Sequence, residues 1–378
     1  MPDKTLILLR KELHAHPEVS NKEKETSKRI KQFVSQFKPD QLIENLGGFG
    51  LLFTYDSGNP GPEVLFRCDM DALPIHETNG FIHKSCFDNI AHKCGHDGHM
   101  VIMSGLAKSL FQKKPEKGKV FLLFQPAEET GEGALKVLND SNFKDINPDY
   151  VFALHNLPGY SKNQIIIKDS TFSSSVSSMI IKLEGKTAHA AEPEHGINPS
   201  LAISKIIDEF EKLNTNNPKE DDFVVITSIF CKIGSKAYGT AAGRGEIHFT
   251  LRTWSQQNMD RLKDKLVSII DSLAKNHLLK YSIDWIQDFQ STKNDIEVNA
   301  IIRNAARLNG LDIFEKQEPF KWGEDFGIFT QKYKGAMFGL GAGNDTPALH
   351  NPDYDFPDKL IPTGINMFRS IINQICNK

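Results

Sequence analysis

The sequence has no excess of charge of either sign. Its 378 residues include 45 Lys and Arg against 48 Asp and Glu, which gives a net charge of −3 with neutral histidines. A protein whose main partner is nucleic acid needs concentrated positive charge to neutralise phosphates, and the sequence has no stripe of Lys and Arg. Gly and Pro are limited to 27 and 18 residues, too few for a low-complexity chain. A disordered chain and a nucleic-acid binder are therefore excluded.

Cysteine and long apolar runs are also scarce. The five cysteines are odd in number and widely scattered, which does not suit a disulfide-stapled secreted domain. The apolar run at residues 5–9 is too short for a signal peptide, and no stretch approaches the roughly 20 apolar residues of a membrane span. We therefore expect a cytoplasmic protein in a reducing compartment, without a membrane partner.

What the sequence does contain is an alternation of short apolar runs with helical segments. The runs at 64–66, 120–124 and 150–154 are continuously apolar, which predicts strands buried on both faces, as in a parallel sheet. Helical segments at 97–113 and 133–139 lie between them. The pattern predicts an α/β fold, and the length predicts about two domains.

The order of elements changes at about residue 173. The next part of the chain predicts strand, helix, strand, strand, helix and strand, which is the ferredoxin-like unit. After it, a helical segment at 299–309 and an apolar run at 335–341 return to the first pattern. We therefore predict a first domain formed by residues 1–172 and 287–378, interrupted by a second domain at 173–286.

Four short segments carry side chains that can bind a divalent metal ion. In the densest, Cys94 and His96 lie two positions apart, and thiolate and imidazole ligands suit an ion such as zinc. The other three follow predicted strands or a glycine-rich loop: Glu128–Glu129, His155 and His350. Ligands of open α/β sheets bind beyond the carboxyl ends of the strands, so we expect the four segments to converge.

Each segment by itself has a simpler interpretation. Cys94 could be a small buried hydrophobe, and a strand-terminal histidine such as His155 often caps a loop. Glu128 and Glu129 could be solvated acids or part of the first turn of a helix. Adjacent carboxylates at a strand end point in different directions, however, so one can bind a metal while the other acts as an acid or base. The coincidence of all four segments favours a metal site.

Three further residues give weaker signals. Asp69 and Asp71 follow the predicted strand at 64–66 with a spacing that places them on the same side, where they could orient metal-bound imidazoles. Turn-forming aspartates before Pro74 are an almost equal alternative. His189 lies in a loop of the predicted second domain without a local ligand partner, and its spacing alone indicates a structural residue.

Together these residues resemble the M20 metallopeptidase and amidohydrolase clan, in particular its hippurate hydrolases, N-acyl-amino-acid amidohydrolases and plant auxin-conjugate hydrolases. The resemblance covers nearly the whole chain, and the motifs follow the family's order: RKELHAHPE, FRCDMDALPI, HKCGHDGHM, FQPAEETGEGA, ALHNLPG, GKTAHAAEPEHGINP, WGEDFGIF and LHNPDYDFPD. It implies an exopeptidase-like catalytic domain with a mixed, largely parallel sheet. The inserted α+β ferredoxin-like domain would be a lid that also forms a homodimer or homotetramer.

The resemblance also implies roles for individual residues. Two divalent ions (Zn, Mn, Ni or Co) would be bridged by Cys94, and the general base would be Glu128. The remaining metal ligands would be His96, Glu129, His155 and His350. His189 would bind the substrate and polarise its carbonyl group. Three acidic residues would support the site: Asp69, Asp71 and Glu324.

One loop departs from the family pattern. The family usually has Asn-Val-Ile-Pro ahead of a strand that ends in Arg-Thr-Phe, whereas this chain has Gly-Thr-Ala-Ala at 239–242 ahead of Leu-Arg-Thr-Trp at 251–254. This loop commonly faces the substrate in the family, so the missing Asn removes a contact and weakens the inference about substrate. The implied metal ligands are unaffected.

The activity implied by the resemblance is hydrolysis of the amide bond of an N-acyl amino acid, such as an N-acetyl or N-benzoyl derivative. Three alternatives remain at this point. The same metal site could serve a dipeptidase or aminopeptidase, or Cys94 could act as a nucleophile with His96 or His99 as its base. A catalytically silent binding protein is the third, but it predicts missing ligands, and every matching position is filled.

Overall fold

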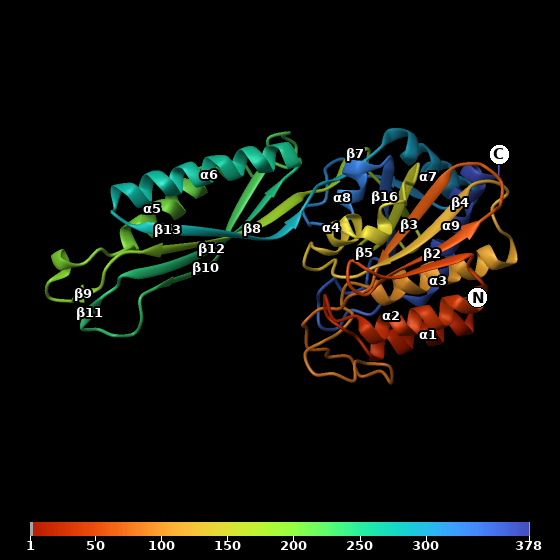
Figure 1. Cartoon of the computed structure of the whole chain (residues 1–378), viewed down its shortest axis with the longest axis horizontal. Coiled ribbons are helices and arrows are strands. Elements are labelled where there is room, and N and C mark those ends of the chain that lie inside the picture. Colours follow the sequence, from red (N-terminus) through yellow and green to blue (C-terminus); the bar gives the residue numbers. More distant parts are fainter. Residues whose placement is uncertain (1–2, 378) are drawn as a thin grey trace. The chain divides into compact units, whose positions relative to one another are not determined.

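The computed structural model describes residues 3–377, which divide into two compact units (Figure 1). Unit 1 contains the described residues up to Phe172, then Thr292–Gln317 and those from Glu324 onward. Unit 2 contains Ser173–Ser291 and Glu318–Gly323. The second unit thus continues past residue 286, where the sequence pattern placed its end. It also includes a segment from much later in the chain, because Ser174 N donates to Phe320 O at 2.9 Å.

Unit 1 is built on one mixed sheet of eight strands. Its four central strands run parallel and carry the apolar runs that predicted buried strands. From one edge to the other, the strands are β1 (Gln41–Leu46), β2 (Gly50–Asp56), β4 (Lys119–Gln125), β3 (Glu63–Asp69), β5 (Tyr150–Pro158), β16 (Gly335–Gly343), β6 (Ile165–Ile167) and β15 (Ile313–Glu315). The predicted α/β class with a largely parallel sheet is confirmed.

Helices cover this sheet. One large apolar cluster joins strand residues such as Phe66 and Phe338 to five helices, which bury their apolar faces against it. These helices are α1 (Lys4–Ala15), α2 (Lys24–Val34), α3 (His96–Gln112), α7 (Ile296–Leu308) and α9 (Ile361–Cys376). Two short helices, α4 (Gly133–Asn139) and α8 (Gly327–Lys332), pack on β4, on β16 and on each other. Pro17 lies in the non-helical segment between α1 and α2.

Unit 2 has its own core. Its two central strands place buried side chains at alternate positions over most of their length, and buried residues such as Ile181 and Phe249 pack on two helices. In chain order the elements are β8 (Ser175–Glu184), α5 (Ser200–Glu211), β10 (Val224–Ile233), β12 (Arg244–Thr253), α6 (Gln256–Asn276) and β13 (Lys280–Phe289). The sheet order is β10-β12-β8-β13, and every pairing is antiparallel. The predicted ferredoxin-like arrangement is confirmed.

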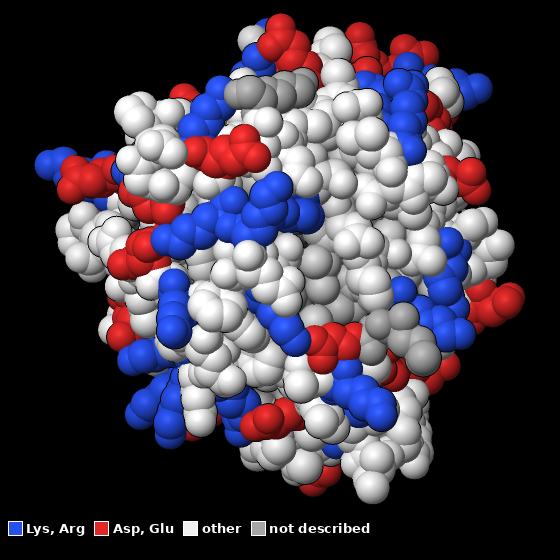
Figure 2. Space-filling model, turned by 90° about the vertical axis from the view of Figure 1, so that its right-hand side faces the viewer, with Lys and Arg blue, Asp and Glu red and all other residues white. Residues whose placement is uncertain are grey.

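Small elements complete the two units. Two-stranded ladders join β9 (Ala188–His189) to β11 (Thr240–Ala241) and β7 (Ser170–Ser173) to β14 (Thr292–Asn294). Single-turn helices are η1 (Ser35–Phe37), η2 (Ser141–Phe143), η3 (Pro193–His195) and η4 (Asp358–Leu360). Across residues 3–377, none of the helices is both long and apolar enough to span a membrane. On the face drawn in Figure 2, basic and acidic side chains are interspersed, as the small net charge leads us to expect.

Candidate metal centre

The expected ligands of unit 1 lie around the carboxyl ends of its central strands. Glu128 and Glu129 follow β4, and His350 lies in the loop after β16. Cys94 lies two residues before His96, the first residue of α3. His155 differs from the expectation, because it lies inside β5 and not after it. The reason is that β5 continues to pair with β16 beyond residue 154, with His155 opposite Gly339. All four segments still meet where sheets of this class bind ligands.

Cys94 is shared by two groups of potential ligands. Its Sγ lies 3.5 Å from Nε2 of His155. Cys94, His96 and His155 form one group whose ligand atoms all lie within 4.8 Å of one another, and Cys94, Glu129 and His350 form a second. A third group of the same size joins Glu128 to His96 and Glu129. A thiolate common to two groups has the placement that a ligand bridging two ions needs.

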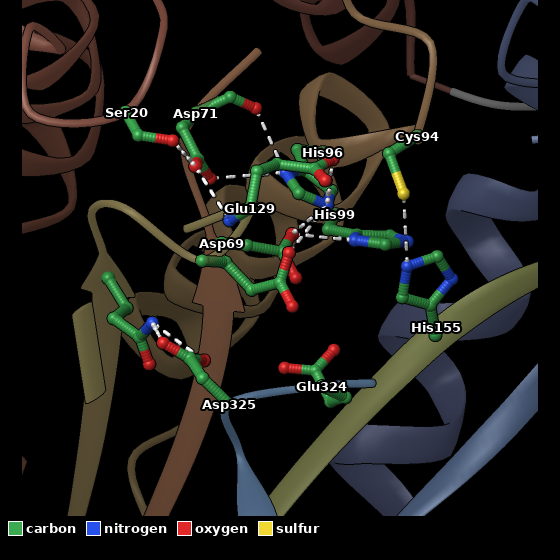
Figure 3. Close-up of polar contacts among 12 residues, drawn as sticks. Ser20, Asp69, Asp71, Cys94, His96, His99, Glu129, His155, Glu324 and Asp325 are labelled. Atoms are coloured by element: carbon green, nitrogen blue, oxygen red, sulfur yellow. Dashed lines mark hydrogen bonds and ion pairs between the residues drawn. The ribbon is translucent and has the colours of Figure 1, made fainter. Parts of the chain in front are cut away.

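Buried polar atoms without partners give an independent indication of a metal. Nε2 of His96 and Oε1 of Glu129 are both buried, and neither atom has a hydrogen-bond partner. They lie 3.8 Å apart, and Figure 3 shows their side chains converging on the space beside Cys94. Such orphaned atoms are rare in folded proteins and point to an ion that the structure does not contain. A thiol, imidazoles and a carboxylate suit Zn, Co, Ni or Mn, so the residues present fit a metal centre.

Asp71 connects two of the expected ligands. Its Oδ2 accepts hydrogen bonds from Glu129 N at 2.9 Å and from Ser20 Oγ at 2.6 Å. Its own backbone oxygen accepts a hydrogen bond from Nδ1 of His96 at 2.9 Å. Because Nδ1 donates, the neutral imidazole leaves Nε2 free to bind a metal. The structure thus places Asp71 where it orients both a histidine and the backbone of a glutamate.

Asp69 contacts His99, which the sequence analysis named only as an alternative base for a Cys94 nucleophile. His99 Nδ1 donates to Asp69 Oδ1 at 2.7 Å, and His99 Nε2 accepts from Asn156 N at 3.1 Å. The imidazole rings of His99 and His155 are 4.8 Å apart. His99 lies three residues after His96 on α3, a spacing that places both on one helix face and could have identified it from the sequence.

A buried arginine lies beneath the carboxylates. Arg67 donates to Asp69 Oδ2 at 2.8 Å and to Asp325 Oδ1 at 2.6 Å, and its Nη2 lies 3.0 Å from Glu324 Oε1. Glu324 therefore belongs to this cluster, as the family motif implied. Arg67 and Asp325 were not expected as site residues, because 258 positions separate them in the chain. Arg67 supplies positive charge to a cluster that would otherwise be strongly negative.

The environment shifts the pKa values of several groups in the cluster. Burial raises the pKa of Glu128 well above its usual range, and the charges of Glu324 and Glu129 raise it further. Burial also raises the pKa of Glu129, to about 8. The pKa of the Cys94 thiol is raised well above its usual value by burial and by these same carboxylates. A bound cation would counter these shifts by favouring the thiolate and carboxylate forms.

Two of the histidines are shifted in opposite directions. Burial lowers the pKa of His155 well below its usual value, and the nearby imidazole of His99 adds to this effect. For His96 the lowering effect of burial is outweighed by Asp69, Asp71 and Glu129, so that its pKa rises to about 10. The carboxylates around His96 thus attract positive charge to the position between them, whether it is a proton or a metal ion.

The loop that carries Cys94 is tightly constrained. Gly95 has a φ of 93°, and a Cβ built there would clash with Nδ2 of Asn156. That same Nδ2 donates to Cys94 O at 2.7 Å. On the other side, His350 N donates to Lys93 O at 2.7 Å, while the His350 side chain remains 52% exposed. The glycine is therefore required for the close approach of this loop to β5.

His189 is the one expected site residue outside unit 1. It lies on β9 in unit 2 with an exposed side chain, so it is not among the residues that unit 1 brings together. Ala191 N donates to His189 Nδ1 at 3.1 Å, which leaves the proton of the neutral ring on Nε2. Its direct partner across the β9–β11 ladder is Thr240, from the loop that departs from the family pattern.

Comparisons with known proteins agree with this geometry. The model of peptidase family M20/M25/M40 matches residues 65–374. The chain is 30% identical to N-acetyl-L-cysteine deacetylase from Bacillus subtilis, over 95% of this chain and 85% of that protein. It is 29% identical to N-acetyldiaminopimelate deacetylase from Priestia megaterium, over 93% of each. A dinuclear metal-binding peptidase of the M20 family from Bacillus subtilis has a similar structure, with 25% identity, a TM-score of 0.83 and coverage of 97% of this chain and 96% of that one.

Proposed function

Because the chain belongs to peptidase family M20/M25/M40 and is a metal-dependent hydrolase, we propose that it hydrolyses the amide bond of N-acyl amino acids with two divalent ions. The observation that carries this proposal is the position of Cys94 in two adjoining ligand groups, with Glu128 in a third group beside them. The two deacetylases with similar sequences support an N-acetyl or related N-acyl amino acid as the substrate.

Five side chains would hold the ions: Cys94, His96, Glu129, His155 and His350. Bound divalent ions supply Lewis-acid polarisation of a carbonyl group and lower the pKa of water. The chain itself supplies the geometry for this chemistry. Asp71 holds the backbone of Glu129 and accepts a hydrogen bond from Nδ1 of His96, so these two ligands are oriented before a substrate arrives.

Glu128 would be the general base. It would take a proton from the attacking water as the new bond to the carbonyl carbon forms, and return that proton to the nitrogen when the C–N bond breaks. The products are a carboxylic acid and an amino acid with a free amine. The burial that raises the pKa of Glu128 suits this second step, since the protonated form must persist long enough to donate.

His189 would contribute from unit 2. With its proton on Nε2, the neutral ring can donate a hydrogen bond to a carbonyl oxygen on which negative charge develops. Thr240 lies directly opposite His189 on β11, so the loop that differs from the family pattern is adjacent to this histidine. The part of the substrate that contacts this loop is therefore where we expect this enzyme to differ from related hydrolases.

The test is a hydrolysis panel with N-acetyl, N-benzoyl and longer N-acyl amino acids beside dipeptides. The enzyme is first stripped with a chelator and then reloaded with one metal at a time. We expect N-acyl amino acids to be cleaved only after reloading. Hydrolysis that survives chelation would indicate the Cys94 nucleophile instead, and a clear preference for dipeptides would indicate a peptidase.

The assignment of the base has its own test. Glu128→Gln should bind metal normally and lose turnover by about 10²–10⁴-fold, since it removes the proton acceptor and keeps the size of the side chain. Glu132→Gln, which changes an exposed carboxylate near the same turn, is the control and should retain full activity. Near-normal turnover in Glu128→Gln would rule out this role.

We also propose that unit 2 mediates self-association. Its strand β10 forms one edge of the four-stranded sheet, and its outer half carries exposed apolar side chains, with Ile229 59% and Phe230 44% exposed. An exposed edge of this kind can pair with another strand. A second copy of the chain offers the same ten-residue edge in an antiparallel direction about a twofold axis, which supports a homodimer.

A further inference from the structure

We propose that Glu23 is a positioning residue for the turn that carries Glu128 and Glu129. Its buried carboxylate would hold the backbone of Ala127 and so determine where the next two carboxylates point. The inference rests on the proposed function, because it takes Glu128 as the base and Glu129 as a metal ligand. No sequence motif assigned a role to Glu23.

The turn has an unusual backbone. Ala127 has a φ of 54°, in the left-handed region that residues with a Cβ rarely adopt. Within the turn, Gly131 N donates to Glu128 O at 2.8 Å and Gly133 N donates to Ala127 O at 3.0 Å. A left-handed alanine is strained and persists only where neighbouring contacts hold it. The backbone N–H of Ala127 therefore needs a partner outside the turn.

Glu23 provides that contact. Its Oε1 accepts hydrogen bonds from Ala127 N at 2.8 Å and from Asn21 N at 3.0 Å. The side chain is fully buried, and its other oxygen, Oε2, has no hydrogen-bond partner. Glu23 stands at the N-terminus of α2 but makes no side-chain cap there. A buried carboxylate that neither caps its own helix nor satisfies both oxygens is costly, and the contact with Ala127 is what it contributes.

A second carboxylate holds the other side of the same turn. Glu129 N donates to Asp71 Oδ2, which also accepts from Ser20 Oγ, as Figure 3 shows. Asp71 is itself tied to the N-terminal segment, because Ala72 N donates to Glu18 O at 2.8 Å. The segment from Glu18 to Glu23 therefore holds the turn twice, once directly and once through Asp71. Glu128 lies between the two held N–H groups.

Removing the Glu23 carboxylate should let Ala127 relax toward an ordinary conformation and turn Glu128 away from its position. A misplacement of about 1 Å at a reacting group can cost about 100-fold in rate. We therefore expect Glu23→Ala to lower kcat by about 10–100-fold with little change in KM. Glu23→Gln keeps an oxygen that can accept from both N–H groups and should restore most of the activity.

The experiment compares these two variants with wild type and with Asp295→Ala. Asp295 is the matched control, because its carboxylate also accepts from two backbone N–H groups, those of Glu297 and Val298, but it caps α7. Four quantities are measured: kcat, KM, the melting temperature, and the visible absorption of each protein after its metal is replaced by cobalt(II). The cobalt bands report the arrangement of ligands that include Glu129 and do not depend on the substrate.

We expect kcat or the cobalt spectrum to change in Glu23→Ala and to return toward wild type in Glu23→Gln. Asp295→Ala should melt a few degrees lower but keep both signals. The inference is overturned if neither signal changes in Glu23→Ala, if Glu23→Gln behaves like the alanine variant, or if Asp295→Ala changes them equally. If wild type cleaves no N-acyl amino acid, the proposed function fails, while the cobalt spectra still decide the role of Glu23.

Discussion

At the scale of single residues, the loop that carries the candidate ligands rests on a buried network of charges. His14, on α1, is fully buried between two carboxylates, with Nδ1 2.8 Å from Asp97 Oδ2 and Nε2 3.0 Å from Glu77 Oε1. Glu77 in turn accepts from Lys93 Nζ at 2.6 Å. Lys93 and Asp97 flank the residues Cys94 and His96, so this network fixes both ends of the metal-binding loop to the N-terminal helix.

This network predicts a pH dependence of stability. Burial would lower the pKa of His14, but Asp97 and Glu77 outweigh it and raise the pKa to about 9. The stabilisation from protonated His14 is therefore complete below its unfolded pKa of about 6.5 and is lost as the pH rises through about 9. The difference corresponds to roughly 3 kcal/mol at about 1.4 kcal/mol per unit.

His14→Gln tests this dependence by urea unfolding at about pH 6 and above pH 9. We expect the variant to be less stable than wild type at the lower pH, and the difference to shrink by roughly 3 kcal/mol at the higher pH. His16→Gln, which removes a partly exposed imidazole from the same segment, is the control. A loss of stability in His14→Gln that is equal at both pH values would contradict the prediction.

At the scale of elements, the two edges of the unit 2 sheet differ. Along β10 every residue from Thr227 to Ile233 is exposed, whereas β13 at the opposite edge alternates partly buried and exposed side chains over most of its length. The apolar side chains of Ile229, Phe230 and Ile233 would lie in an interface if two copies of β10 pair. Charge on this strand would oppose that pairing.

The double substitution Ile229→Lys and Phe230→Lys should convert a dimer to a monomer. Analytical ultracentrifugation across a range of protein concentrations measures this change, and we expect the dimer dissociation constant to rise at least tenfold. Ile286→Lys is the control, since it introduces the same charge at an exposed position of the other edge strand, β13. A wild-type protein that sediments as a monomer, or a control that dissociates equally, would contradict pairing through β10.

At the scale of the whole molecule, the two units have separate cores, and the expected metal ligands lie in only one of them. All five expected ligands lie in unit 1, and the apolar core of unit 2 is formed by its own strands and helices. An ion that binds only the folded form of one unit stabilises that unit by mass action. Removing it also lessens the positive charge that compensates the buried carboxylates around Arg67.

Calorimetry with and without a chelator tests this separation. We expect two unfolding transitions, of which chelation lowers one by several degrees and leaves the other unchanged. Glu129→Gln changes one expected ligand in unit 1. The transition that has the same temperature in this variant as in wild type is assigned to unit 2. A single transition, or an equal shift of both, would show that the units unfold together.

The sequence by itself determined the fold class and the identity of the candidate ligands. Continuous apolar runs predicted the central strands, because a strand covered on both faces has no polar side to alternate with. The ligands could be found since metal-binding side chains followed those strands. The strands β1 and β2 and the helix α9 were not predicted, and the three-residue strands β6 and β15 have too few residues to form a recognisable pattern.

Only the tertiary structure decided how distant residues cooperate around that site. Arg67 and Asp325, and likewise Glu23 and Ala127, are joined across long stretches of chain by hydrogen bonds that leave no periodic signal. Local patterns report which face of an element is buried, because burial repeats with the period of a helix or strand. The partner of a buried carboxylate depends instead on how whole elements pack, and that arrangement places the candidate base and the candidate ligands in this protein.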